Sequence, residues 1–402
     1  MHDLIIKNAN LATPLGHRPI KGADFGDILN TPANIAITSG CISYVGPELP
    51  AAKTTIDAEG RLVTPGLVDC HTHMVFGGSR QNELAKKLAG ADYLDILAAG
   101  GGILSTVAAT RDAEAAALLA RAAGFADKML RHGTTTAEAK SGYGLDVENE
   151  LKQLKVAQKL NQQHPIDIVC TFIGAHAVPG EYKGRTDAYV DYVVAEMIPA
   201  AAGFAEFCDI FCEKGVFDAE QSRRVLAAAL DAGFGVKIHA NEINNLGGAV
   251  LAAELGAVSA EHLIASDESD MEALAAAGVI GVLLPATSFY LGKPYADAKR
   301  MVEKGVAIAV ASDFNPGSSP NFNLQLSMTI ACLKYGLTPA QVLTAATLNA
   351  ACAIGRGGVV GSVEAGKAGD IVIWDCPDLD YLFYRYGDNQ ARVVIKKGVV
   401  AD

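Results

Sequence analysis

Short apolar runs alternate with longer amphipathic stretches through the middle of the chain. Each run is almost continuously β-branched or otherwise apolar, which is typical of parallel strands buried on both faces. Because parallel strands need long crossover connections, the pattern predicts a series of strand–helix units. Eight such runs occur, at residues 62–70, 134–140, 167–175, 208–213, 235–240, 257–263, 279–285 and 306–312.

Helical patterns separate most of these runs. One covers residues 112–133, and we expect it to begin at Asp112 as the N-cap and to end at Gly133. Another covers residues 219–233 and also ends in glycine. Eight strands with crossover helices predict an α/β fold, a TIM-type (β/α)8 barrel. An open doubly wound sheet is the alternative, but no glycine-rich phosphate loop follows the first strand.

Both ends of the chain carry further strand patterns, separated by glycine and proline. We predict that residues 1–60 and 365–402 pair into a small β-rich domain resembling a β-sandwich. Residues 61–364 would then form the barrel. The patterns lie at residues 3–10, 33–40, 41–46, 370–375 and 391–400.

Composition and charge narrow the possible partners. The chain has 402 residues, half of them hydrophobic, and a formal net charge of -12. An acidic surface without basic clusters argues against nucleic acid and anionic membranes as partners. The start of the chain does not resemble a signal peptide, and the apolar runs are too short to span a bilayer. We therefore expect a soluble, cytoplasmic protein.

The eight cysteines form no C-x-x-C pair. Cys208 and Cys212 lie in one apolar run, where small buried side chains are the simplest interpretation. We therefore do not expect a metal site built from cysteine.

Residues with reactive side chains gather at the C-terminal ends of the predicted strands. A barrel enzyme opens its active site at this end, so the positions indicate a catalytic site. Five of the nine histidines lie there, which is difficult to attribute to chance. The strand-end residues are His71 and His73, Lys140, His176, Glu213, His239, His262 and Asp313.

The pair His71 and His73 is the strongest indication of a metal site. Residues two apart on an extended strand point to one face, so both imidazoles can reach one ion. His239 is the natural third ligand and Asp313 the fourth. Three imidazoles and one carboxylate suit zinc or ferrous iron and do not distinguish between them. The alternatives are hydrogen-bonded core histidines and an aspartate that caps a turn.

Two residues are candidates for proton transfer. A metal ion lowers the pKa of its water to roughly 7, but a base must still move a proton to the leaving group. Glu242 lies beyond the strand that carries His239, although it could equally stabilise a helix N-terminus. His262 follows Glu261 in an apolar run, where it could act directly or support a ligand.

Two segments are candidates for substrate binding. The loop SGYGLD, residues 141–146, places Tyr143 between two glycines. Arg80 follows His73 by seven residues. Arginine holds a carboxylate well through two hydrogen bonds, and an acidic protein needs such a cation to attract an anionic substrate. A surface ion pair is the alternative for Arg80.

With these residues in place, the chain resembles the amidohydrolase superfamily and, within it, the imidazolonepropionase family. The resemblance covers nearly the whole length. PGLVDCHTH and AGKAGDIVIWD are shared across the superfamily, whereas SGYGLD, GAHAVP and DFNPGSSP are more specific. Further matching segments are AAGGGILSTVAATR, FCEKGVF, KIHANE and AEHL.

The resemblance implies hydrolytic ring opening of 4-imidazolone-5-propanoate to N-formimidoyl-L-glutamate in histidine degradation. It implies one zinc or iron ion per chain, held by His71, His73, His239 and Asp313. His262 matches an activating or supporting histidine, and Glu242, His262 and Asp313 would be the catalytic residues. The implied substrate contacts are Arg80, Tyr143, His176, Glu242, Asn315, Gly317 and Ser318.

One departure from other branches of the superfamily bears on the number of ions. Members with two metals use a carboxylated lysine at the end of the fourth strand, where this chain has Glu213. Lys214 is one residue away and should point off the site. We therefore expect one ion.

Two other functions fit parts of the pattern. A deaminase of a purine-like or pyrimidine-like ring would use the same metal ligands and release ammonia, but it would not need Arg80 or the 141–146 loop. A non-catalytic relative would have lost ligands, whereas all four are present. By analogy with similar barrels, we expect a homodimer that acts on a small anionic molecule.

Overall fold

Eight parallel strands form a sheet in which neighbours in space are also neighbours along the chain. The structure is a computed structural model that describes residues 1–89 and 101–401. This strand order confirms the predicted barrel and excludes a doubly wound sheet, in which the order reverses. The strands are β6 (Leu67–Asp69), β7 (Thr134–Lys140), β8 (Asp167–Ala175), β9 (Phe207–Cys212), β10 (Gly235–Ala240), β11 (Ser259–His262), β12 (Ile280–Leu283) and β13 (Ile308–Val310).

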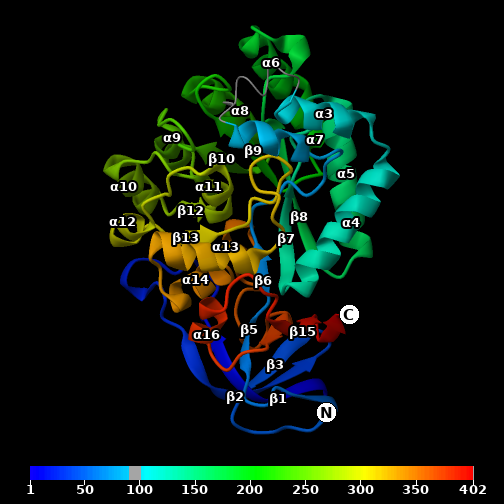
Figure 1. The fold of residues 1–402 in the computed structure, drawn as a ribbon, viewed down its shortest axis with the longest axis vertical. Helices are drawn as coiled ribbons and strands as arrows, with labels where there is room; N and C mark the ends of the chain where they lie inside the picture. Colours follow the sequence, from blue (N-terminus) through cyan, green and yellow to red (C-terminus); the bar gives the residue numbers. More distant parts are fainter. Residues whose placement is uncertain (90–100, 402) are drawn as a thin grey trace.

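Helices follow each barrel strand and pack around the outside of the sheet (Figure 1). Their inward faces are apolar and join the strands in the largest buried cluster of the molecule. The helices are α1 (Leu84–Leu88), α3 (Ile103–Asp112), α4 (Ala115–Arg131), α5 (Val147–Gln163), α6 (Thr186–Tyr192), α7 (Ile198–Ala201), α8 (Ala219–Asp231), α9 (Gly248–Glu254), α10 (Glu268–Ala277), α11 (Pro285–Leu291), α12 (Ala298–Glu303), α13 (Leu324–Ile330), α14 (Pro339–Ala345), α15 (Leu348–Ala353) and α16 (Leu379–Tyr384).

The predicted start of one helix is wrong. Asp112 is the last residue of α3, and α4 begins at Ala115 after its N-cap, Glu114. Ala113 and Glu114 are both extended, so the predicted helix is α4 alone, and α3 is a separate helix before it that the pattern did not predict. The predicted helix over 219–233 is α8, where the Asp218 side chain accepts a hydrogen bond from the Gln221 amide in a capping box.

The barrel closes between the segments that follow its first and last strands. The Asp313 amide donates to the His71 carbonyl at 3.1 Å, and the His73 amide donates to the Phe314 carbonyl at 2.8 Å. The Asp69 carboxylate accepts from the Ser312 amide at 3.0 Å and from its hydroxyl at 2.5 Å. This seam therefore joins two of the predicted metal-binding segments directly.

A second sheet is built from both ends of the chain. The N-terminal and C-terminal strands lie together below the barrel in Figure 1. Hydrogen bonds order seven strands as β16-β15-β14-β5-β1-β2-β3, and β4 also pairs with β1. The strands are β1 (His2–Thr13), β2 (Leu29–Thr38), β3 (Cys41–Gly46), β4 (Ala52–Asp57), β5 (Leu62–Pro65), β14 (Ile371–Trp374), β15 (Ala391–Lys396) and β16 (Val399–Ala401).

The first predicted barrel strand is divided in the structure. Residues 62–65 form β5, which pairs with β1 and β14 in the terminal sheet, and the barrel begins with β6. Gly66 lies at the division, where a Cβ would collide with the Thr135 side chain. The close approach of the Thr135 side chain to this backbone requires glycine here. The domain boundaries near residues 60 and 365 stay a prediction.

Two further findings concern the range of residues that the structure describes. No helix in the described ranges has the length and apolarity needed to cross a bilayer. The segment AAGGGILSTVAATR begins at residue 98, so its first three residues lie outside the part of the chain that the structure describes.

Candidate active site

The predicted strand-end residues lie where the sequence analysis places them. His71 and His73 follow β6, His239 lies in β10, His262 is the last residue of β11, and Asp313 follows β13. These five side chains are at most 4% exposed. The C-terminal end of the barrel therefore brings residues from distant parts of the chain into one buried cluster.

The three predicted histidine ligands each use Nδ1 for a contact with the protein. His71 Nδ1 lies 2.7 Å from Glu261 Oε2, and His239 Nδ1 lies 3.0 Å from Asp209 Oδ2. His73 Nδ1 lies 3.4 Å from the Ser141 carbonyl oxygen. These acceptors favour the tautomer that leaves Nε2 as the free nitrogen, which is the arrangement of histidines that bind metals.

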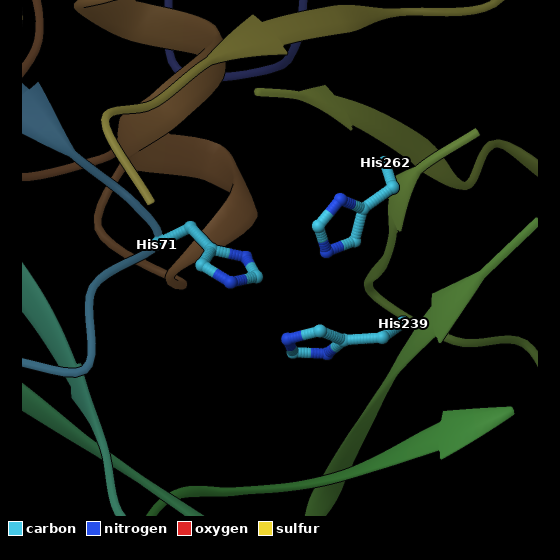
Figure 2. A group of neighbouring side chains, drawn as sticks. All are labelled: His71, His239 and His262. Carbon is cyan, nitrogen blue, oxygen red and sulfur yellow. The ribbon is translucent and has the colours of Figure 1, made fainter. Parts of the chain in front are cut away.

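The Nε2 atoms point into a shared space. Figure 2 shows His71, His239 and His262 directed toward one another from three elements. Within the described ranges, Nε2 of His71 and Nε2 of His239 are buried without a hydrogen-bond partner. Nδ1 of His239 lies close to Asp209 but does not meet hydrogen-bond geometry there. Buried nitrogens without partners are costly unless a ligand satisfies them, so both atoms suit a metal ion.

Asp313 supplies the carboxylate of the cluster. Its Oδ1 lies 3.4 Å from His71 Nε2, and its Oδ2 accepts from the Thr287 hydroxyl at 2.6 Å. Burial alone would raise the pKa of Asp313, but contacts with His71 hold it well below its ordinary value. The carboxylate is therefore charged and ready to bind a cation.

The electrostatics of His71 also indicate a cation site. Burial and the charge of Lys140 lower the pKa of His71, but Asp313 and Glu261 outweigh both and raise it to about 9. The surroundings thus favour a positive charge at this position, and a divalent metal would supply it. Among the described residues, three overlapping groups could each hold one ion, because their ligand atoms lie within 4.8 Å of one another. The groups are His71, His73 and Asp313; His71, His239 and His262; and His73, His176 and His239.

Glu242 and His262 lie together beside this cluster. Glu242 Oε2 is 3.7 Å from His262 Nε2. Burial, with a smaller contribution from Asp313, raises the pKa of Glu242 to about 7. Burial lowers the pKa of His262 to about 4, so its imidazole is neutral at neutral pH. A carboxyl group with a pKa near neutrality is well suited to accept and return a proton.

His176 and Tyr143 form one wall of the site. The ring of His176 stacks on that of His73 with centroids 4.8 Å apart, and the Tyr143 ring lies 5.5 Å from His176. Burial lowers the pKa of His176 to about 3 and raises that of Tyr143. A neutral imidazole and a protonated phenol are both suited to hydrogen bonding with an uncharged ring.

Arg80 is part of an ion pair as well as a candidate for substrate binding. Its Nε and Nη2 donate to the Glu83 carboxylate at 3.0 Å each, which uses two of its five N–H groups. A Cβ on Gly317 would collide with Nη1 of Arg80, so this glycine lets the guanidinium approach the 313–318 loop. The side chain is 12% exposed, so the ion-pair alternative is present but does not lie on the open surface.

The side chain of Asn315 is used within its own loop. Its oxygen accepts from the amides of Gly317 and Ser318 at 2.8 Å each, and its nitrogen donates to the Asp313 carbonyl at 2.7 Å. These hydrogen bonds fix the turn that follows Asp313, the predicted carboxylate ligand. Asn315 thus shapes the place where Gly317 approaches Arg80.

Glu213 is buried away from the metal cluster and holds a loop. Its Oε2 accepts from the amides of Ile243 and Asn244 at 2.9 Å and 3.1 Å, next to Glu242. Lys214 is exposed, as expected from the predicted register of this strand.

Several residues that support the predicted ligands were not foreseen from the sequence. Glu261 and Asp209 accept the Nδ1 contacts of His71 and His239, and Thr287 contacts Asp313. An acidic residue within an apolar strand was the available signal for Asp209. Thr287 follows the seventh strand, for which the sequence offered no reactive side chain.

The backbone is unusual where these side chains emerge. Non-glycine residues with positive φ follow or end three strands: Asn241 (55°), His262 (71°) and Asp313 (52°). Such conformations are costly and persist where the surroundings enforce them, commonly at functional sites.

Comparisons with known proteins agree on one family. A model of the amidohydrolase family matches residues 62–401. An imidazolonepropionase of Alkaliphilus metalliredigens is 51% identical over 412 residues, covering 99% of this chain and 97% of that protein. An imidazolonepropionase of Brevibacillus brevis is 51% identical over 406 residues, covering 98% and 96%.

Solved structures share the fold at lower identity. A 5-methylcytosine deaminase from Klebsiella pneumoniae, liganded with 5-fluorocytosine, superposes with a TM-score of 0.74 at 17% identity, covering 99% of this chain and 97% of that one. An adenosine deaminase from Xanthomonas campestris with bound zinc gives a TM-score of 0.67 at 21% identity, covering 99% and 92%. At these identities the likeness concerns the fold alone.

Proposed function

Because the chain belongs to the amidohydrolase family and, within it, to the imidazolonepropionases, we propose that it opens the ring of 4-imidazolone-5-propanoate. The product is N-formimidoyl-L-glutamate, a step in histidine degradation. Water adds to the ring carbonyl carbon, and the amide C–N bond breaks. The observation that carries the proposal is identity of about one half over nearly the full length with proteins of this activity.

We propose one zinc or iron ion per chain, held by Nε2 of His71, His73 and His239 and by the Asp313 carboxylate. The free, buried Nε2 atoms of His71 and His239 and the charged carboxylate support this donor set. When bound, the ion would polarise the carbonyl oxygen and lower the pKa of water at the site. Glu213 occupies the position at which members with two metals have a carboxylated lysine, which agrees with a single ion.

Glu242 is the proposed proton carrier. It accepts the proton of the attacking water and returns it to the ring nitrogen as the C–N bond breaks. His262 lies 3.7 Å away, and as a neutral imidazole it can donate a hydrogen bond to the oxygen that gains charge. His176 and Tyr143 would orient the polar edge of the ring.

The pH dependence follows from the pKa of Glu242. Its pKa of about 7 means that the carboxyl group gains a proton as the pH falls through neutrality. A protonated Glu242 cannot accept another proton, so kcat/KM should fall about tenfold per pH unit below that pKa. A pH profile of kcat/KM measures this acid limb. If the limb is unchanged in the Glu242→Gln variant, it belongs to another group.

Arg80 is the proposed partner of the propionate tail. Arg80→Ala should raise KM roughly 10- to 100-fold, the loss expected for hydrogen bonds to a charged group, with a smaller change in kcat. Steady-state kinetics measure the two effects separately. Arg224→Ala removes an arginine that pairs with Asp187 and Asp191 on the outer helices, and it serves as the control. Unchanged KM in Arg80→Ala would remove the argument for a carboxylate grip.

The test of the function is a comparison of two reactions on purified protein. Ring opening of imidazolone propionate should proceed, whereas release of ammonia from aminated purine or pyrimidine rings should not. Elemental analysis of the same preparation should find close to one zinc or iron ion per chain. Ammonia release without ring opening would replace the proposal with a deaminase.

A cytoplasmic location and a homodimer complete the proposal. The net charge of -12 supports a small-molecule substrate without a nucleic acid or membrane partner. Light scattering on the purified protein tests the assembly, and the mass of a single chain would contradict it.

A further inference from the structure

Charged side chains fill the barrel interior beneath the proposed metal site. They come from three strands of the barrel and are at most 1% exposed. The inside of a barrel is ordinarily packed with apolar layers, so this arrangement is unusual. The residues are Glu138 and Lys140 in β7, Asp209 in β9, and Lys237 in β10.

The side chains form a row of alternating charge. Lys237 Nζ lies 2.7 Å from Glu138 Oε1, and Glu138 Oε2 lies 3.2 Å from Lys140 Nζ. Lys140 Nζ then lies 2.7 Å from Asp209 Oδ2. The same Oδ2 lies 3.0 Å from Nδ1 of His239, so the row ends at a proposed metal ligand.

Asp209 is held on both of its oxygens. Oδ1 accepts from the Ile210 amide at 2.7 Å, while Oδ2 is shared by Lys140 and His239. Lys140 is thus the cation that fixes the oxygen contacting the imidazole. Without it, Asp209 would be a buried carboxylate whose position depends on one amide and on the histidine itself.

Energetics argue against a role in stability alone. A buried ion pair loses so much hydration that apolar residues of the same volume often stabilise a protein as well or better. Carboxylates fix the ring orientation and the tautomer of histidines that bind metals. A row of charges that ends at such a histidine can therefore serve to orient its imidazole.

We propose that Lys140 is a positioning residue for the metal site. It holds Asp209 so that the carboxylate faces the Nδ1–H of His239 as a hydrogen-bond acceptor and leaves Nε2 for the ion. This inference rests on the proposed function of His239 as a ligand.

Two lysine variants separate this role from a general contribution to folding. Lys140→Met and Lys237→Met each remove a fully buried ammonium that pairs with Glu138. Lys140 also contacts Asp209, whereas Lys237 lies one step further along the row. We expect Lys140→Met to weaken zinc binding roughly 10- to 100-fold in chelator competition, the usual effect of losing an outer partner. Lys237→Met should bind zinc as the wild type does.

A spectroscopic measurement reports on the imidazole itself. In protein with nitrogen-labelled histidine, the Nδ1 protons of His71 and His239 should give downfield proton resonances, since each lies against a carboxylate. Lys140→Met should shift or remove the His239 resonance and leave that of His71, while Lys237→Met leaves both. If Lys140→Met does not fold, Asp209→Asn tests the same contact and should also weaken zinc binding.

The outcomes distinguish failure of the proposed metal site from failure of the proposed role of Lys140. Wild-type protein that binds neither zinc nor iron overturns the proposed metal site. Wild-type protein that binds zinc, with Lys140→Met or Asp209→Asn binding it equally well, overturns the inference alone. Equal loss of affinity in both lysine variants also overturns it, because general destabilisation would then explain the effect.

Discussion

Replacing Asp313 with alanine should abolish turnover, by at least about 10³-fold, because the ion supplies several kcal/mol of transition-state stabilisation. Asp313 is the proposed carboxylate ligand, 3.4 Å from His71 Nε2. Its loss leaves three imidazole ligands and removes the negative charge that attracts the cation. The measurements are kcat and the metal content of the purified variant.

Asparagine is the matched control at this position. Asp313 has a φ of 52°, a conformation that asparagine tolerates better than alanine. Asp313→Asn therefore removes the negative charge with less backbone strain. It should lose activity and metal as Asp313→Ala does while unfolding at a temperature closer to that of the wild type. Asp313→Asn with full metal content and normal kcat would contradict the ligand assignment.

Glu242→Gln should lower kcat roughly 10²- to 10⁴-fold, the range for loss of a general acid–base group. The amide keeps the size of the side chain but cannot accept a proton. The metal content should change little, because Glu242 is not among the proposed metal ligands. Steady-state kinetics and elemental analysis measure both points.

A His262 variant shows which of the two groups carries the proton. The pKa of His262 is about 4, so its imidazole takes up a proton less readily at neutral pH than the Glu242 carboxylate, whose pKa is about 7. His262→Gln should therefore lose activity but keep the acid limb near pH 7. If His262→Gln abolishes the limb and Glu242→Gln preserves it, the assignment is reversed.

Much of the fold followed from periodicity along the chain. Runs of apolar or β-branched residues identified all eight barrel strands, as is typical of parallel strands buried on both faces. The same pattern could not divide residues 62–70 into β5 and β6. Both strands are fully buried, and only partners far away in the sequence decide to which sheet each belongs.

The residues of the proposed metal site were easier to predict than those that support them. His71 and His239 lie at strand ends, where position alone indicates chemistry. Glu261 and Asp209 lie within strands, and nothing local indicates which imidazole each one contacts. Pairing of this kind depends on strand neighbours and side-chain direction, which become visible only in three dimensions.

Arg80 shows a further limit of sequence reasoning. The sequence offered a carboxylate grip or an ion pair as alternatives, and the structure contains the ion pair with Glu83. Because a guanidinium has more N–H groups than one carboxylate can use, the two interpretations are compatible. Sequence spacing could not have shown this.

The seam of the barrel has a consequence for how the protein matures. His71 and His73 leave the ribosome early, whereas Asp313 arrives after most of the chain has been made. A nascent chain therefore has no complete donor set until the last strand docks against the first, through contacts such as Asp69 with Ser312. An ion that binds only the closed barrel stabilises the closed barrel by mass action. The metal should thus bind only when folding is complete. Removal of the ion should first weaken the contacts between the segments that follow the first and the last strand of the barrel.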